Sequence, residues 1–457
     1  MTYHLIAVGG AVMHNLALAL KQNGHQVTGS DDEIYEPARS RLQAFDLLPD
    51  RDGWHSERIS TDLDAVILGM HARKDNPELA QAQELGVPIY SFPEFIYNHS
   101  AQKTRIVVAG SHGKTTTTSM IMHVLRHAGR DFDYLVGALL EGFDTMVRLS
   151  DAPVMVIEGD EYLASPIDLR PKIMHYKPHV AIITGVAWDH ANVFPTFENY
   201  VLQFENFIKT LDTDLSRYNR EGVLFWYKHD KELQQISLAS PCKSIAYEAF
   251  DSDISEGKTV LKTEDGRRVN LEIFGDHNLA NLKAAYLACR EIGVSDDEFF
   301  TAIPSFTGAA KRLQILAKAK TSIAFLDFAH APSKVKATID AMHAQYPERQ
   351  LVACLELHTF SSLSKSFLPQ YAATMQAADE AVVFFNEHTL AMKKMPPLSI
   401  DEVKAFFNHP NLHVFTDNQK LVEFLKERAF KNRNLLLMTS GTFVGLNLKE
   451  LATGLLE

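Results

Sequence analysis

Residues 106–118 read IVVAGSHGKTTTT, and this stretch decides the fold class. An apolar, β-branched run enters a loop that carries Gly110 and Gly113, and Lys114 and Thr115 follow where a helix would begin. Such a strand–loop–helix turn brings backbone N–H groups and a helix dipole to phosphate oxygens. The common loop, G-x-x-x-x-G-K-[ST], would need glycine where Val108 stands. We therefore predict a variant phosphate loop, with Lys114 on the terminal phosphates and Thr115 on Mg²⁺.

The first hundred residues alternate short apolar runs with helical patterns. Strand-like runs cover 4–10, 26–31, 65–70 and 88–92. A helix is predicted after Asn76, because Pro77 suits its first position and Gly86 its end. Strands that alternate with helices favour a parallel sheet covered on both faces.

The remainder of the chain repeats this alternation twice. Buried strands are predicted over 154–160 and 179–186, a hairpin around Asp265-Gly266, and helices over 278–292 and 295–303. At 457 residues, and about 150 per domain, the chain should form three α/β domains. We place them at 1–102, 103–306 and 307–457.

Composition excludes several classes of protein. The net charge of −12 argues against a nucleic-acid partner and against an anionic membrane. No 18 consecutive apolar residues occur, which predicts no membrane insertion. Three scattered cysteines without a CxxC pair favour a reducing compartment. The first residues lack the basic and apolar regions of a signal peptide, so we expect a cytoplasmic protein.

Acidic side chains gather where two predicted strands end. Glu158, Asp160 and Glu161 close the first run, and Asp189 and His190 follow the next. In open α/β sheets, ligands bind at the carboxyl ends of the strands. Carboxylates and a histidine beside a phosphate loop suit Mg²⁺ held between phosphate and acceptor oxygens.

With these motifs the chain resembles the Mur ligases, ATP-dependent enzymes that build the peptide of bacterial cell-wall precursors. The loop AGSHGKTTTT is similar to their TGT-x-GKTTT loop, and FGDHNLANLKAAYLA (274–288) to their G-x-HN-x-x-N segment. AAKRLQIL (309–316) and LDFAHAPSKV (326–335) resemble two further segments of the family. The resemblance implies nucleotide contacts from His277, Asn278 and Asn281 near adenine, Arg312 on phosphate, Asp327 on ribose and His330 beside the nucleotide.

The resemblance also implies the architecture and the reaction. A Rossmann-like N-terminal domain would hold a UDP-sugar, a central P-loop domain would bind ATP, and a Rossmann-like C-terminal domain would close over both and complete the ATP and peptide sites. A substrate carboxylate would attack ATP to form an acyl phosphate, which an amine then displaces. Lys114, Glu158 and His190 would be catalytic, with Mg²⁺ on Thr115, Glu158 and His190. The phosphate contacts would come from Gly110, Ser111, His112, Gly113, Lys114, Thr115 and Thr116.

Two branches of the family fit, and both use UDP-N-acetylmuramate. One adds L-alanine in biosynthesis; the other attaches an L-alanyl-γ-D-glutamyl-meso-diaminopimelate tripeptide in peptidoglycan recycling. The long link EGDEYLASPIDLRPKIMHYKPHV (158–180) resembles the tripeptide branch and favours it. Its Arg170 and Lys172, together with Arg73, are candidate partners for the peptide's charged end. A P-loop ATPase switch without ligase activity is a more distant alternative.

Further substrate contacts are predicted at five positions. Gly9 lies in a loop similar to the family's first glycine loop, and Asp31 stands 22 residues later, where a ribose-binding acid would sit. His71, His358 and Ser361 complete this set. The chain departs from the family at Gly159, where relatives have Ala, at Gly185, where they often have Asn, and at Ala331, which replaces a second His.

Overall fold

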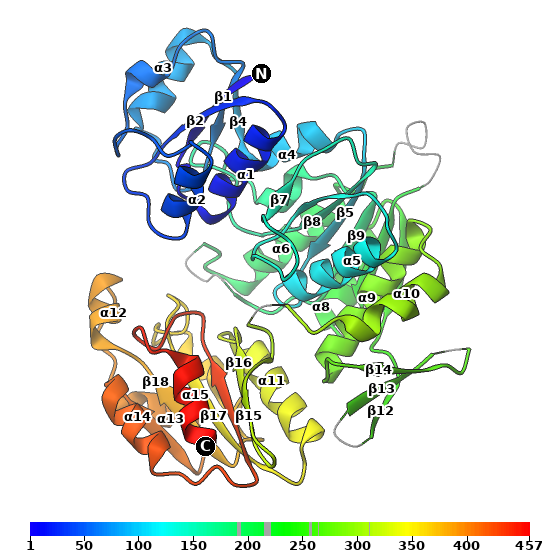
Figure 1. Cartoon of the computed structure of the whole chain (residues 1–457), viewed down its shortest axis with the longest axis vertical. Helices are drawn as coiled ribbons and strands as arrows, with labels where there is room; N and C mark the ends of the chain where they lie inside the picture. Colours follow the sequence, from blue (N-terminus) through cyan, green and yellow to red (C-terminus); the bar gives the residue numbers. More distant parts are fainter. Residues whose placement is uncertain (190–192, 214–220, 256–257, 264, 310) are drawn as a thin grey trace. The chain divides into compact units, whose positions relative to one another are not determined.

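The protein is a mixed α/β chain whose sheets are mostly parallel (Figure 1). This computed structural model describes residues 1–189, 193–213, 221–255, 258–263, 265–309 and 311–457. Its strands belong to four sheets within the described residues, and three of the sheets have helices between successive strands. No helix among these residues is long and apolar enough to cross a membrane.

The N-terminal sheet is fully parallel, in the order β2-β1-β3-β4. The predicted helix after Asn76 is confirmed, because the Asn76 side chain accepts from two backbone N–H groups of the first turn and Gly86 ends the helix with φ 69°. Apolar side chains on both sides of β1 and β3 are buried. The elements are β1 (Thr2–Ile6), α1 (Ala11–Gln22), β2 (Gln26–Ser30), α2 (Ala38–Ala44), η1 (Ser56–Arg58), β3 (Ala65–Leu68), α3 (Pro77–Leu85), β4 (Ile89–Ser91) and α4 (Phe92–Ser100).

The central sheet has the order β11-β10-β9-β5-β8-β6-β7, and only β7 runs antiparallel to its neighbour. Its middle strands are the apolar runs read from the sequence, and they are buried on both faces as parallel strands require. The strands are β5 (Thr104–Ala109), β6 (Asp133–Leu135), β7 (Val147–Arg148), β8 (Val154–Glu158), β9 (Val180–Ile183), β10 (Val223–Tyr227) and β11 (Lys243–Tyr247). The helices that follow in the chain are α5 (Lys114–His127), η2 (Lys172–His175), α6 (Phe197–Ile208), α8 (Lys231–Ile236), η3 (Ser237–Ala239), α9 (Asp276–Glu291), α10 (Asp296–Ala302) and η4 (Ile303–Ser305).

A small antiparallel sheet precedes α9. It contains β12 (Ser252–Ser255), β13 (Lys258–Lys262) and β14 (Arg268–Leu271). The predicted hairpin is confirmed by the pairing of β13 with β14, and Gly266 takes φ 83° in the connection. The two helices predicted after it are α9 and α10.

The C-terminal sheet follows the order β15-β16-β20-β17-β18-β19, with only β15 antiparallel. Alternate residues of one strand enter different cores: Phe325 packs with the cluster of α11 and α13, whereas Leu326 packs with that of α14 and α15. The sheet is therefore covered on both faces. Its elements are β15 (Gln314–Lys318), β16 (Ile323–Asp327), α11 (Pro332–Gln345), β17 (Gln350–Glu356), η5 (Leu368–Tyr371), β18 (Glu380–Phe384), α12 (Glu387–Met392), α13 (Ile400–Phe407), β19 (Leu412–Phe415), α14 (Asn418–Lys426), β20 (Arg433–Met438) and α15 (Leu448–Leu456).

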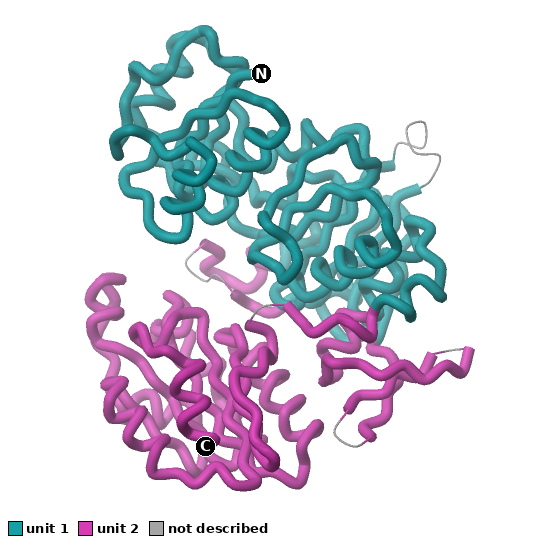
Figure 2. Tube along the Cα trace, viewed as in Figure 1, with its two compact units in different colours: residues 1–186, 201–248, 283–302 teal, residues 187–200, 249–282, 303–457 magenta. Residues whose placement is uncertain are grey.

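The chain forms two compact units (Figure 2). The first comprises residues 1–186, 201–248 and 283–302 and contains the N-terminal and central sheets. The second comprises 187–200, 249–282 and 303–457 and contains the small sheet and the C-terminal sheet. Each sheet lies inside one of the three blocks predicted from the sequence, and the boundaries of those blocks stay a prediction.

Arg105, on β5, is a fully buried cation that ties several segments of the first unit together. Its guanidinium donates to the carbonyl of Ser100 at 2.7 Å and to that of Tyr176 at 2.8 Å. It also pairs with Asp212 at 3.1 Å. A buried guanidinium needs such partners, because an unpaired buried charge is strongly unfavourable. Arg105 thus fixes the end of α4 and the residues after η2 to the central sheet.

Replacing Arg105 should destabilise the first unit severely. Arg105→Met removes the charged donor that these carbonyls and Asp212 share, so the free energy of unfolding should fall by about 3 kcal/mol or more. Urea unfolding followed by circular dichroism measures the change. Arg73→Met is the control, because that side chain is 81% exposed and its ion pair is with exposed Asp75. Equal stability of the two variants would contradict the structural role given to Arg105.

Candidate nucleotide site

The phosphate loop runs from the end of β5 to the start of α5, as the sequence predicts. Gly113 precedes α5 in the left-handed region, with φ 76°. Gly110 has φ 130°, and a Cβ there would lie 2.2 Å from the Thr184 hydroxyl oxygen. Glycine at 110 is therefore required both by conformation and by the neighbouring strand end. These constraints explain why this loop has a glycine at 110, where the common motif does not require one.

His112 is held inside the loop by the end of β9. The Thr184 hydroxyl donates to the His112 carbonyl, and the Ser111 N–H donates to the Gly185 carbonyl at 2.9 Å. A Cβ on Gly185 would lie 2.6 Å from Cε1 of His112. The glycine that replaces the family's Asn thus provides space for the His112 ring. Sequence reasoning missed this coupling, although the departure from the family pattern at Gly185 was visible.

Two loop side chains bind the carboxylates that end β8. The Thr115 hydroxyl donates to Glu158 at 2.7 Å, and the other carboxylate oxygen of Glu158 accepts the Gly137 N–H at 2.8 Å. The Lys114 ammonium donates to Glu161 at 2.8 Å and to the Gly110 carbonyl at 2.6 Å. The sequence places Glu161 in the acidic group but does not identify it as the partner of the loop lysine.

This arrangement keeps Lys114 charged. Burial alone lowers the pKa of Lys114, but the carboxylates of Glu161, Asp160 and Glu158 outweigh it, so the pKa is raised. A lysine that stays protonated at neutral pH can compensate phosphate charge. A hydroxyl and a carboxylate oxygen 2.7 Å apart, from Thr115 and Glu158, are the hard donors that Mg²⁺ prefers.

Of the second predicted pair, Asp189 and His190, the structure describes only Asp189. His190, predicted as catalytic and as a metal ligand, lies outside the described residues. Asp189 is buried in the second unit and pairs with Lys334, on the first turn of α11, at 3.0 Å. Trp188 packs edge-to-face on Phe367 in the same unit.

The second unit contains the six predicted nucleotide contacts that lie outside the phosphate loop. Arg312 lies over the Phe328 ring at 4.8 Å, and the His330 ring meets that ring edge-on at 5.1 Å. Asp327 accepts backbone N–H groups from Leu313 at 2.8 Å and from Ala329 at 2.7 Å. The carboxylate therefore shapes the backbone of its own segment; its ribose contact stays a prediction.

Two histidines and two asparagines among these residues have defined local environments. Burial lowers the pKa of His330 to about 3, and its Nδ1 lies 2.7 Å from the Phe328 carbonyl. Burial also lowers the pKa of His277, although the negative charge of Asp327 acts in the opposite direction. Asn278 donates to the Phe274 carbonyl at 2.9 Å, and Asn281 is buried on the same helix, α9. Both histidines are therefore neutral at physiological pH.

The five predicted substrate contacts lie in both units. Asp31 accepts the Gly9 N–H at 2.8 Å, and burial and the neighbouring Asp32 raise the pKa of Asp31 to about 6. His71 is exposed after β3. His358 follows β17 and lies 3.8 Å from Glu356, and Ser361 is buried three residues later. Contacts of these side chains with a substrate stay predictions.

The first unit therefore contains a P-loop nucleotide-binding site with an acidic strand end, and the second a polar and aromatic group of the kind that contacts a nucleoside. Three family models match consecutive parts of the chain: the Mur ligase family catalytic domain (residues 2–104), the Mur ligase middle domain (108–289) and the Mur ligase glutamate ligase domain (311–441). The chain belongs to the Mur ligase family, which confirms the family and the three-domain fold expected from its motifs. It is an ATP-dependent ligase that forms a carbon–nitrogen bond.

The similarity to known proteins covers nearly the whole chain. The UDP-N-acetylmuramate–L-alanyl-γ-D-glutamyl-meso-2,6-diaminoheptandioate ligase of Escherichia coli K12 is 27% identical over 99% of this chain and 98% of its own. The UDP-N-acetylmuramate–L-alanine ligase of Lactiplantibacillus plantarum is 28% identical over 96% and 95%. The crystal structure of a murein peptide ligase from Psychrobacter arcticus has the same fold, with a TM-score of 0.66, 22% identity and coverage of 100% and 99%.

Enlarging Gly185 should damage the phosphate loop. Gly185→Ala places a methyl group against His112 and strains a backbone with φ 150°, so affinity for ADP should fall and unfolding should become easier by about 1–3 kcal/mol. Isothermal titration with ADP and urea unfolding measure the two effects. Gly454→Ala, with open space around its Cβ, is the matched control. Unchanged ADP affinity in Gly185→Ala would show that His112 does not shape the loop.

Proposed function

We propose that the protein joins the carboxylate of UDP-N-acetylmuramate to the amine of an L-alanyl-γ-D-glutamyl-meso-diaminopimelate tripeptide, at the expense of ATP. The observation that carries this proposal is the end-to-end match with tripeptide ligases of Escherichia coli and Haemophilus influenzae, each 27% identical. The long link between β8 and β9 supports the same branch. Its place would be peptidoglycan recycling in the cytoplasm.

The residues of the phosphate loop suit the first chemical step. The substrate carboxylate attacks the γ-phosphorus of ATP, the bond to the bridging oxygen breaks, and ADP leaves with its electron pair. Two anions must approach, and the Lys114 ammonium and the backbone N–H groups at the start of α5 offset their charge. Thr115 and Glu158 would hold Mg²⁺, which when bound neutralises phosphate charge.

The second step transfers the acyl group. The peptide amine attacks the carbonyl carbon of the acyl phosphate, and the tetrahedral intermediate expels inorganic phosphate as the amide forms. Water must be kept from the acyl phosphate until the amine binds. We propose that His358 and Ser361, after β17, contact the peptide, and that Gly9, Asp31 and His71 contact the UDP-sugar.

The alternative amine is L-alanine. The Lactiplantibacillus plantarum alanine ligase matches the chain at 28% identity, but over 96% of this chain and 95% of its own, against 99% and 98% for the Escherichia coli tripeptide ligase. The more distant alternative is a P-loop ATPase switch, which would hydrolyse ATP in the absence of either amine.

The amine requirement is tested directly. Purified protein with ATP, Mg²⁺ and UDP-N-acetylmuramate should release phosphate and form a nucleotide-linked product, detected by mass, when the tripeptide is supplied. L-Alanine at the same concentration should give far less product. Product with L-alanine alone would assign the protein to the biosynthetic branch, and phosphate release without any amine would support the switch.

Lys114 should be needed for turnover but not for UDP-sugar binding. Lys114→Ala removes the cation that offsets phosphate charge, so kcat should fall roughly 100-fold or more. Its affinity for UDP-N-acetylmuramate, measured by titration without ATP, should stay close to that of the wild type. Loss of UDP-sugar affinity in this variant would contradict the assignment of that ligand to the N-terminal sheet.

A further inference from the structure

The link between β8 and β9, residues 159–179, is an ordered part of the first unit. It folds back on itself: the Ala164 N–H donates to the Arg170 carbonyl at 2.9 Å, and the Lys172 N–H donates to the Tyr162 carbonyl at 2.8 Å. Leu163 and Pro171 form an antiparallel bridge between the two arms. This fold-back returns Lys172 to the start of the segment, beside Asp160.

The returning arm packs on the end of β8. Ile173, in η2, is fully buried, and a Cβ on Gly159 would lie 2.9 Å from its Cγ2 atom. The glycine that replaces the family's Ala at 159 therefore makes room for Ile173. Beyond η2, Arg105 binds the carbonyl of Tyr176 at 2.8 Å. The position of Lys172 is thus fixed from both sides.

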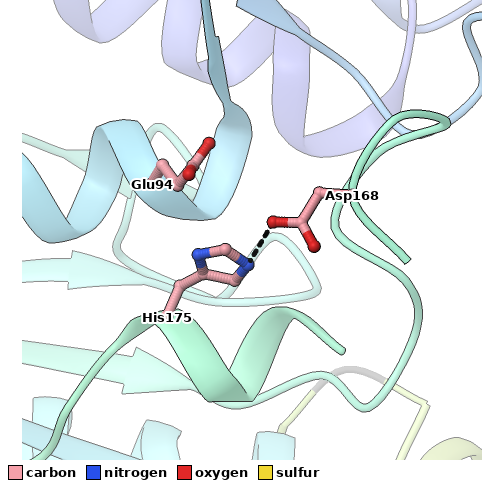
Figure 3. A group of neighbouring side chains, drawn as sticks. All are labelled: Glu94, Asp168 and His175. Carbon is pink, nitrogen blue, oxygen red and sulfur yellow. Dashed lines mark ion pairs between the residues drawn. The ribbon is translucent and has the colours of Figure 1, made fainter. Parts of the chain in front are cut away.

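A charged cluster pins the tip of the segment to α4. Figure 3 shows Asp168 and His175 pointing toward each other, with Glu94 on α4 beside them, and the Asp168–His175 distance is 3.1 Å. The three side chains offer ligand atoms within 4.8 Å of one another, as a metal site would. However, Arg170 already donates to both oxygens of Asp168, at 2.9 and 2.7 Å, and lies 3.9 Å from Glu94. The cation of this cluster is the guanidinium, and its role is to hold the segment.

The segment held in this way places the Lys172 ammonium beside the acidic end of β8. The Lys172 ammonium lies 2.7 Å from Asp160, and the lysine side chain is only 16% exposed. Asp160 stands between Glu158, bound by Thr115, and Glu161, bound by Lys114. Without Lys172, the carboxylate of Asp160 would repel an incoming phosphate and attract the Lys114 ammonium.

We propose that Lys172 is a positioning residue for the nucleotide. It neutralises Asp160 and so leaves Lys114 free to turn from Glu161 to the phosphates when a nucleotide binds. This inference rests on the proposed use of ATP at the phosphate loop, and it assigns Lys172 no contact with substrate. The link between β8 and β9 thus raises the affinity of the site for the nucleotide by neutralising Asp160.

Nucleotide binding tests the proposal without requiring the ligation reaction. ADP affinity is measured by isothermal titration for the wild type, Lys172→Met, Asp160→Asn and the double variant. Lys172→Met should weaken ADP binding roughly tenfold, within the range of couplings between neighbouring charged residues. Lys172→Arg and the double variant should bind ADP nearly as the wild type does, because the arginine keeps a cation beside Asp160 and the double variant has no carboxylate there to compensate. In steady-state assays the loss should appear in KM for ATP, with kcat nearly unchanged.

Lys228→Met is the matched control, because Lys228 forms an exposed ion pair with Glu248 in the same unit. A double variant as weak as Lys172→Met would mean that Lys172 acts on the ligand directly and would overturn the proposal. Wild-type affinity in a Lys172→Met variant with an unchanged melting temperature would also overturn it. Failure of the wild type itself to bind ADP would instead contradict the proposed function.

Discussion

The negative charge at the carboxyl end of β8 is the constraint on which the nucleotide site depends. Glu158, Asp160 and Glu161 fall within four residues, and their mutual repulsion must be offset for the strand end to keep its place. Each has a partner: the Thr115 hydroxyl, the Lys172 ammonium and the Lys114 ammonium. Two of these partners come from the phosphate loop itself. The loop and the acidic strand end therefore stabilise each other before any nucleotide is present.

Close packing at the same edge of the central sheet explains why glycine occupies three positions there. Gly110 is required by Thr184, Gly185 by the His112 ring, and Gly159 by Ile173. The last two stand where the family usually has larger residues, and in this chain each leaves space for a neighbouring side chain. Both departures from the family pattern therefore have a steric reason within this chain.

Local signals in the sequence predicted much of the fold. Helix α3 follows from Asn76, Pro77 and Gly86, whose effects act within one turn, and the β13–β14 hairpin follows from its turn and alternating flanks. The phosphate loop was predictable because strand, glycines, lysine and helix are contiguous. Pairings between segments distant in sequence could not be predicted in this way. Lys114–Glu161, Lys172–Asp160 and Lys334–Asp189 each join side chains whose proximity depends on the tertiary structure.

The same distant pairings narrow the search for the determinants of amine choice. Arg170, Lys172 and Arg73 were the basic side chains that could meet a diaminopimelate carboxylate, but each already pairs with an aspartate: Asp168, Asp160 and Asp75. A peptide carboxylate would have to displace those partners, at a cost that is largest for the least exposed pair. Lys172, the least exposed of these three cations, is therefore the least suited to a direct contact with the peptide carboxylate. Contacts that separate a tripeptide from L-alanine are better sought after β17, where His358 and Ser361 follow a buried strand end.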